Sequence, residues 1–113
     1  MLSRWTYGTA LASIFLSATL LVLSAPARGQ DAGAALYKTK CAVCHGPDGK
    51  GETAIGKANK VRDLGSPEAQ KQTDAELTAI IETGKGKMPA YSKSLKPEQL
   101  KDLVAYIRSL GKK

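Results

Sequence analysis

The chain has 113 residues, enough for one small domain, and its 17 Lys plus Arg against 10 Asp plus Glu give a formal net charge of +7. A basic surface of this kind favours acidic partners or anionic membrane surfaces. We expect no nucleic-acid partner, because no aromatic residues are interleaved with the basic ones as they are in proteins that bind single strands.

Residues 1–27 are typical of a secretory signal peptide. They carry a single positive charge near the start and then an apolar run that ends at the small-x-small cleavage pattern Ala25-Pro26-Ala27. We expect cleavage after Ala27, or after Gly29, which leaves residues 28–113 as the mature domain with no membrane span. The alternative is that the run is kept as a membrane anchor, because its length nearly spans a bilayer.

Removal of the signal peptide leaves a small stock of apolar side chains. Only Tyr37, Tyr91 and Tyr106 remain as aromatic residues. Domains of this size usually need a metal, a cofactor or disulfides to be stable. We therefore expect the mature chain to fold poorly unless something apolar is built into its core.

A first helix is expected to start at Asp31, after a short frayed tail at residues 28–30. Asp31 can serve as the N-cap, because its side-chain oxygen can accept from the first free backbone N–H groups. Gly33, Tyr37 and Cys41 are spaced by four residues and therefore share one face of that helix. A glycine on such a face either allows another backbone to approach closely or marks a frayed start of the helix, and this position alone favours the frayed start.

The helix leads into the segment Cys41-Ala42-Val43-Cys44-His45, which is typical of a c-type haem attachment site. Positions i, i+3 and i+4 of a helical turn share one face, so Cys41, Cys44 and His45 can all face one flat object. Each thiol can form a thioether with a haem vinyl group, and the imidazole can ligate the iron. This motif predicts one covalently bound haem c.

Three simpler interpretations of these residues are less satisfactory. A structural zinc site needs about four ligands, and the mature chain holds only these three His or Cys residues. A redox-active dithiol of the thioredoxin kind needs a βαβ pattern, which is absent. A disulfide between Cys41 and Cys44 leaves His45 unexplained.

The stretch after the motif is expected to be loop. Residues 46–56 are turn material, beginning with Gly46-Pro47-Asp48-Gly49-Lys50-Gly51, and they should cover one side of the haem. Residues 57–65 are polar, with two apolar positions.

Two helices are predicted next. Ser66 followed by Pro67 is typical of an N-cap and first helical residue, and this helix should be short. Thr73-Asp74-Ala75-Glu76 has the form of a capping box that opens a second helix. Leu77, Ile80 and Ile81 share one face of it, and Gly84 is its expected C-terminal stop.

The loop Gly84 to Tyr91 contains the candidate for the sixth iron ligand. His45 is the only histidine, so ligation by two histidines of this chain is excluded. Met88 is the only methionine outside the signal peptide, and its glycine-rich polar loop is a poor place for a core residue. A thioether ligand favours the ferrous state and raises the reduction potential.

The last helix should begin at Pro97, with Leu95 and Leu100 as a hydrophobic staple around Lys96. Apolar residues then recur at helical spacing, and Gly111 ends the helix. These residues are Leu100, Leu103, Val104, Ile107 and Leu110. No segment shows the alternation of a strand, so the predicted fold class is all-α.

Taken together, the chain resembles the class I cytochromes c, of the small bacterial monohaem kind, over residues 31–110. The resemblance rests on the Cys41 to His45 motif, on residues 84–91 with Met88-Pro89, and on the closing Leu103-Val104-Ala105-Tyr106-Ile107. It implies a small cytochrome c fold, in which short helices and loops are wrapped around one covalently bound haem.

The resemblance also implies how the first and last helices meet. In that family the two helices cross near a glycine and an aromatic pair, so Gly33 and Tyr37 should meet Leu103 and Tyr106. One departure concerns the proline whose carbonyl accepts from the proximal imidazole in that family. The nearby Pro47 is too close to His45 for this role, so that acceptor is left unassigned.

The expected function is that of a periplasmic electron carrier and not an enzyme, with one-electron transfer through a haem ligated by His45 and Met88. Its partners should be a redox donor and a redox acceptor with acidic docking surfaces, and the protein should be a monomer. Lys40, Lys85 and Lys87 flank the two ligand segments and should ring the exposed haem edge.

Other cations have two open interpretations. Lys57, Lys60 and Arg62 are either haem-propionate partners or solvated surface charges. Two alternative functions also stay open. One is a membrane-tethered cytochrome c subunit of a respiratory complex, and the other is a haem enzyme or gas-binding protein with a labile sixth ligand.

Overall fold

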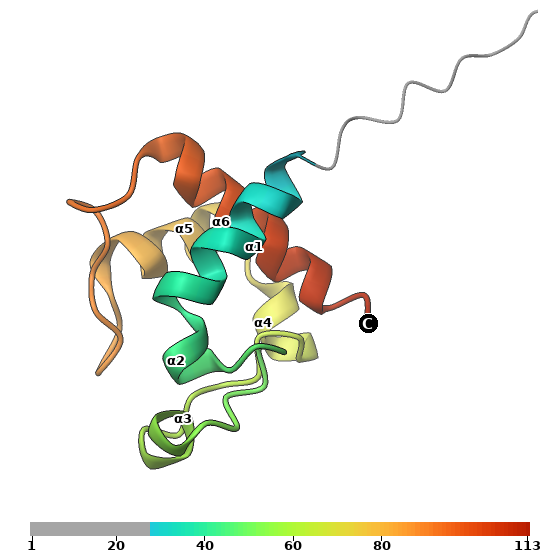
Figure 1. The fold of residues 1–113 in the computed structure, drawn as a ribbon, viewed down its shortest axis with the longest axis vertical. Coiled ribbons are helices and arrows are strands. Elements are labelled where there is room, and N and C mark those ends of the chain that lie inside the picture. Colours follow the sequence, from blue (N-terminus) through green and yellow to red (C-terminus); the bar gives the residue numbers. More distant parts are fainter. Residues whose placement is uncertain (1–27) are drawn as a thin grey trace, which may run out of the picture.

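The computed structural model describes residues 28–113. The expected signal peptide lies outside the described residues, so its cleavage stays a prediction. The described part holds six helices and no strand, which confirms the all-α class (Figure 1). The helices are α1 Arg28–Lys40, α2 Ala42–His45, α3 Ala54–Ala58, α4 Pro67–Lys71, α5 Asp74–Thr83 and α6 Pro97–Leu110.

Helix α1 begins earlier than the sequence predicts. It starts at Arg28, so the frayed tail at residues 28–30 and the N-cap role of Asp31 are both wrong. Asp31 instead lies in the first turn, where its negative charge interacts favourably with the helix dipole. An acidic residue suits either position, so the sequence alone does not distinguish them.

Helices α1 and α6 cross where the glycine and the aromatic pair were expected (Figure 1). A Cβ atom at Gly33 would overlap the Asp102 carbonyl and lie 2.9 Å from the Cβ of Tyr106. The rings of Tyr37 and Tyr106 have centroids 4.9 Å apart and planes tilted by 49°. Tyr37 and Leu103 are both fully buried at this crossing. The crossing implied by the resemblance is therefore confirmed, with the backbone of Asp102 as an additional contact.

Helix α3 was not expected, and the prediction of continuous loop after the motif is wrong at this point. Thr53 is its N-cap, with a side chain that accepts from the Gly56 N–H at 2.9 Å. The same hydroxyl donates to the carbonyl of Cys44 at 3.0 Å. Helix α3 is a single turn and too short to show a period, so only its cap is visible in the sequence.

The starts of α4 and α5 are confirmed. The hydroxyl of Ser66 accepts from the Ala69 N–H at 3.3 Å. Thr73 and Glu76 form the predicted capping box, with reciprocal bonds of 3.1 Å and 2.7 Å. Helix α5 then ends at Thr83, and Gly84 follows with a φ of +75°.

Helix α6 begins at Pro97 as expected. Its cap is half of a capping box, since the side chain of Gln99 accepts from the Lys96 N–H at 2.9 Å and an ammonium group cannot accept in return. Leu95 and Leu100 are both buried in the core, in agreement with the predicted staple. The apolar face of α6 supplies much of the core against α1 and α5.

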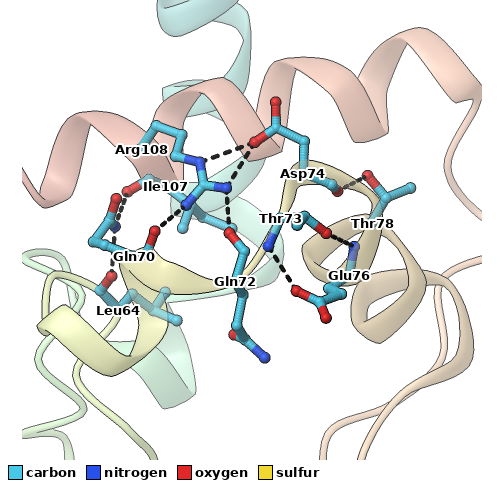
Figure 2. Close-up of polar contacts among 9 residues, drawn as sticks. All are labelled: Leu64, Gln70, Gln72, Thr73, Asp74, Glu76, Thr78, Ile107 and Arg108. Carbon is cyan, nitrogen blue, oxygen red and sulfur yellow. Dashed lines mark hydrogen bonds and ion pairs between the residues drawn. The ribbon is translucent and has the colours of Figure 1, made fainter.

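A polar cluster fastens α4 and the start of α5 to α6 (Figure 2). The Arg108 guanidinium donates to the carbonyls of Gln70 and Gln72 and pairs with Asp74 at 2.8 Å. The side chain of Gln70 donates to the carbonyls of Leu64 and Ile107, at 2.8 Å and 3.0 Å. Because Asp74 is 75% exposed, the partly buried carbonyl bonds stabilise this joint more than the ion pair does.

Candidate functional site

All four predicted haem-binding residues line one cavity. The cavity has a volume of about 400 Å³, within the range of pockets that take a cofactor. Cys41, Cys44 and His45 reach it from the end of α1 and from α2, and Met88 reaches it from the segment between α5 and α6. In Figure 1 that segment, in orange, lies to the left of α2. The fold thus brings together residues that are far apart in the sequence.

The cavity cuts into the hydrophobic core. Its apolar lining comes from α5, α6 and the segment before α4. The apolar residues include Leu64, Leu77, Ile80, Ile81, Leu103 and Ile107. Leu77 and Ile81 are also buried core residues, so the predicted apolar face of α5 supports the core and the cavity at once. A flat, largely apolar group such as a porphyrin suits these walls.

The two thiols of the motif are both free and partly buried. Burial raises the pKa of Cys41 to about 11, with Cys44 adding to the rise and Lys40 opposing it. Among residues 28–113, no group of three or more His, Cys, Asp or Glu side chains is arranged to hold a bare metal ion. Two free thiols at this spacing are the donors that covalent haem attachment requires.

Burial also lowers the pKa of His45 below its ordinary value, which favours the neutral imidazole that can bind a metal. Its Nδ1 atom is buried, and the part of the chain that the structure describes gives it no hydrogen-bond partner. The acceptor that the sequence left unassigned is therefore not supplied by Pro47.

Three of the hydrogen bonds that hold the turn after the motif reach the carbonyls of Cys44, His45 and Gly46. The hydroxyl of Tyr37 donates to the carbonyl of Gly46 at 2.7 Å. The N–H of Gly51 donates to the carbonyl of His45 at 2.7 Å, and Thr53 bonds to the carbonyl of Cys44. These bonds fix the backbone on either side of the imidazole, so the ring is positioned through its main chain.

Met88 closes a tight turn. Lys85 and Met88 exchange two backbone hydrogen bonds of 3.2 Å and 2.9 Å. Gly86 within the turn has a φ of +57°, a left-handed conformation that glycine adopts without strain. A Cβ atom at Gly84 would lie 2.5 Å from the Met88 carbonyl oxygen. Gly84 therefore allows the Met88 carbonyl to approach closely, and Gly86 allows the turn that carries Met88.

Tyr91 is a residue of this site that the sequence reasoning missed. Its side chain lines the cavity, and its hydroxyl donates to the carbonyl of Lys40 at 3.0 Å. Its backbone N–H donates to the carbonyl of Ile81 at 3.0 Å. Burial, aided by Cys41 and Cys44, raises the pKa of Tyr91, so the hydroxyl stays a donor at neutral pH. The only trace in the sequence is an aromatic residue three positions after Met88.

Several cationic side chains line the cavity. Lys40, Lys85 and Lys87, which were expected to flank the haem edge, all contribute to its lining. Of the three candidates for a propionate partner, Lys60 and Arg62 are also in the lining, whereas Lys57 is not. The structure thus favours Lys60 and Arg62 over Lys57 for contact with an anionic group in the cavity.

Comparison with known proteins gives one family match and several relatives. Residues 28–107 match the family described as cytochrome C oxidase, cbb3-type, subunit III. The chain is 39% identical over 92 residues to cytochrome c6 of Nostoc sp. This match covers 79% of this chain and 78% of that protein. It is 34% identical over 80 residues to cbb3-type cytochrome c oxidase subunit FixP of Azorhizobium caulinodans, over 70% of this chain.

The match to FixP covers 26% of that protein, so the chain spans about a quarter of its length. Among solved structures, a c-type cytochrome named KustC0563 is 32% identical and superposes with a TM-score of 0.64. That match covers 69% of this chain and 95% of the other. Within residues 28–113, no helix combines the length and the apolar character needed to cross a bilayer. The chain belongs to this cbb3-type subunit III family of cytochrome c domains, which are small all-α proteins that hold a covalently bound haem c.

Proposed function

We propose that the protein is a one-electron carrier that holds its haem through thioethers to Cys41 and Cys44, with His45 and Met88 as the axial ligands. One observation carries the proposal. Met88 lines the same cavity as the attachment motif, although the two are separated by α3, α4 and α5. The sequence similarity to cytochrome c6 also supports a role in electron transfer.

The haem supplies reversible one-electron chemistry at its iron. The chain contributes burial in an apolar cavity, a neutral imidazole from His45 and a thioether from Met88. A thioether ligand stabilises the reduced state, and with His45 and Met88 both bound to it, the haem would offer no open site for oxygen or peroxide. The protein is therefore a carrier and not an enzyme.

The optical spectrum of the ferrous protein, with and without carbon monoxide, tests this proposal. An unchanged spectrum is expected, because Met88 occupies the position that the gas needs. A rapid spectral shift on adding the gas contradicts ligation by Met88. It would instead support a gas-binding protein or a haem enzyme.

A second candidate is a membrane-tethered subunit of a respiratory oxidase. The match to the cbb3-type subunit III family and to FixP favours it. The chemistry at Met88 and His45 is the same in both cases, and only the fate of the N-terminus differs.

For the carrier, we propose export to the periplasm and cleavage after Ala27 or Gly29, supported by the apolar run and its cleavage pattern. N-terminal sequencing of the protein isolated from cells decides between the two. A new terminus at Arg28 or Gln30 supports the carrier, whereas an intact terminus in the membrane fraction supports the tethered subunit.

A further inference from the structure

We propose that Tyr91 is a positioning residue for Met88, and that its hydroxyl bond to the Lys40 carbonyl holds the thioether in place at the iron. This inference rests on the proposed ligation by Met88. It assigns the positioning of the Met88 side chain to Tyr91, which follows it in the sequence after Pro89 and Ala90.

The hydrogen bonds of residues 84–96 lead mostly back to α5 or to the segment itself. Gly84 bonds to Ile80, and Lys85 and Met88 bond to each other. The N–H of Tyr91 bonds to α5, and its carbonyl accepts from the N–H of Leu95. Among the bonds that the structure gives for these residues, the hydroxyl of Tyr91 makes the one that reaches α1.

The acceptor of this bond, the Lys40 carbonyl, lies at the end of α1 and directly before the haem attachment motif. Lys40 is the last residue of α1, and the carbonyls of a helix's last turn lack partners within the helix. The residue after Lys40 is Cys41, the first attachment point of the haem. The bond therefore satisfies a free carbonyl and also ties the Met88 segment to the segment that carries the haem.

Tyr37 makes a matched bond at the other end of the motif. Its hydroxyl donates to the carbonyl of Gly46, the residue directly after His45. Both Tyr37 and Tyr91 line the cavity, and each donates one hydroxyl bond to a backbone carbonyl next to the motif. If Tyr91 acts on Met88 specifically, loss of the Tyr37 bond should not have the same effect.

The experiment is a titration of the ferric holoprotein with imidazole, which can bind the iron only by displacing Met88. We expect Tyr91→Phe to bind imidazole about two- to tenfold more tightly than the wild type, the range that one net hydrogen bond spans. Tyr37→Phe should raise the affinity less than Tyr91→Phe does, because its bond holds the backbone next to His45 and not the Met88 segment. Both variants should lower Tm, and Tyr37→Phe by more, because its hydrogen bond is buried whereas that of Tyr91 is partly buried.

Two further variants separate the possible failures. If Met88→Ala binds imidazole no better than the wild type, the proposed ligation by Met88 is wrong. If Met88→Ala binds tightly and Tyr91→Phe behaves like the wild type, only the role of Tyr91 is overturned. The role of Tyr91 is also overturned if Tyr37→Phe binds imidazole as tightly as Tyr91→Phe does. It is overturned as well if Tyr91→Leu raises the affinity for imidazole and Tyr91→Phe does not, since packing of the ring and not its hydroxyl bond would then position Met88.

Discussion

The His45 side of the cavity is fastened within a short stretch of sequence, whereas the Met88 side depends on segments far apart in the chain. On the first side, Tyr37, Gly51 and Thr53 bond to the backbone at or next to the motif. On the second, a tight turn is attached to α5, and one hydroxyl reaches across to Lys40. The first side is therefore expected to be rigid, and the second to be the place where ligand exchange begins.

Removal of the haem attachment on the His45 side should have the largest effect. In Cys41→Ser/Cys44→Ser no thioether can form, and a cavity of about 400 Å³ is left in a small core. We expect the cooperative thermal transition to disappear, as measured by circular dichroism. Met88→Ala is the matched change on the other side and should keep a cooperative transition, because its haem stays covalently bound.

A sharp transition in the double serine variant, at a Tm close to that of the wild type, would show that the polypeptide alone makes the fold. The two sides would then differ only in their ligand chemistry. Loss of the transition in Met88→Ala would also contradict the comparison, because it would make the Met88 side as important for folding as the attachment side.

The crossing of α1 and α6 supports both sides, and Gly33→Val tests it. The new side chain would overlap the Asp102 carbonyl and press on Tyr106, so we expect a loss of about 3 kcal/mol in the free energy of unfolding. Urea denaturation of the holoprotein measures it. Ala35→Val is the control, because it adds the same β-branched side chain at an exposed position of α1. An unchanged midpoint in Gly33→Val would contradict the close approach.

On the Met88 side, Gly84→Ala and Gly86→Ala separate steric overlap from backbone strain. Both glycines have positive φ, so the backbone strain of either alanine should cost about 1–2 kcal/mol of stability. Only at Gly84 would the new methyl meet the Met88 carbonyl, since the Cβ position at Gly86 has no atom within 4 Å. We therefore expect carbon monoxide to bind ferrous Gly84→Ala more readily than Gly86→Ala. Equal binding by the two variants would assign the effect to strain alone.

The contrast between the two sides also explains which features could be predicted from the sequence and which could not. The attachment motif and the capping boxes are local patterns, so Cys41 to His45 and the starts of α4 and α5 follow from adjacent residues. The crossing at Gly33 needed the family resemblance, because one glycine has many possible roles. Helix α3 escaped prediction since a single turn has no period.

The Met88 side is less predictable for a physical reason. Met88 was a candidate by elimination, and the cavity that it joins exists only after α5 and α6 have packed. Tyr91 makes its decisive bond to a residue 51 positions away, and an aromatic residue in a loop gives no hint of such a partner. Likewise, only the fold separates Lys60 and Arg62 from Lys57.

The smallest expected effect concerns two of the cations that line the cavity. Lys85 and Lys87 are exposed and belong to the Met88 turn, so they contribute positive potential beside the cavity. In Lys85→Gln/Lys87→Gln, we expect oxidation of the ferrous protein by ferricyanide to slow roughly threefold at low ionic strength. The salt dependence of the rate, followed by stopped-flow absorbance, should also become shallower.

The matched control is Lys112→Gln/Lys113→Gln, which removes the same charge from two exposed residues outside the lining of the cavity. An equal slowing in both double variants would show that net charge governs the encounter and that the Met88 turn is not the docking face. A larger slowing in the turn variant would place electron exit on the Met88 side. The segment that holds the sixth ligand would then also be the surface that meets acidic partners, which links the less rigid side of the cavity to recognition.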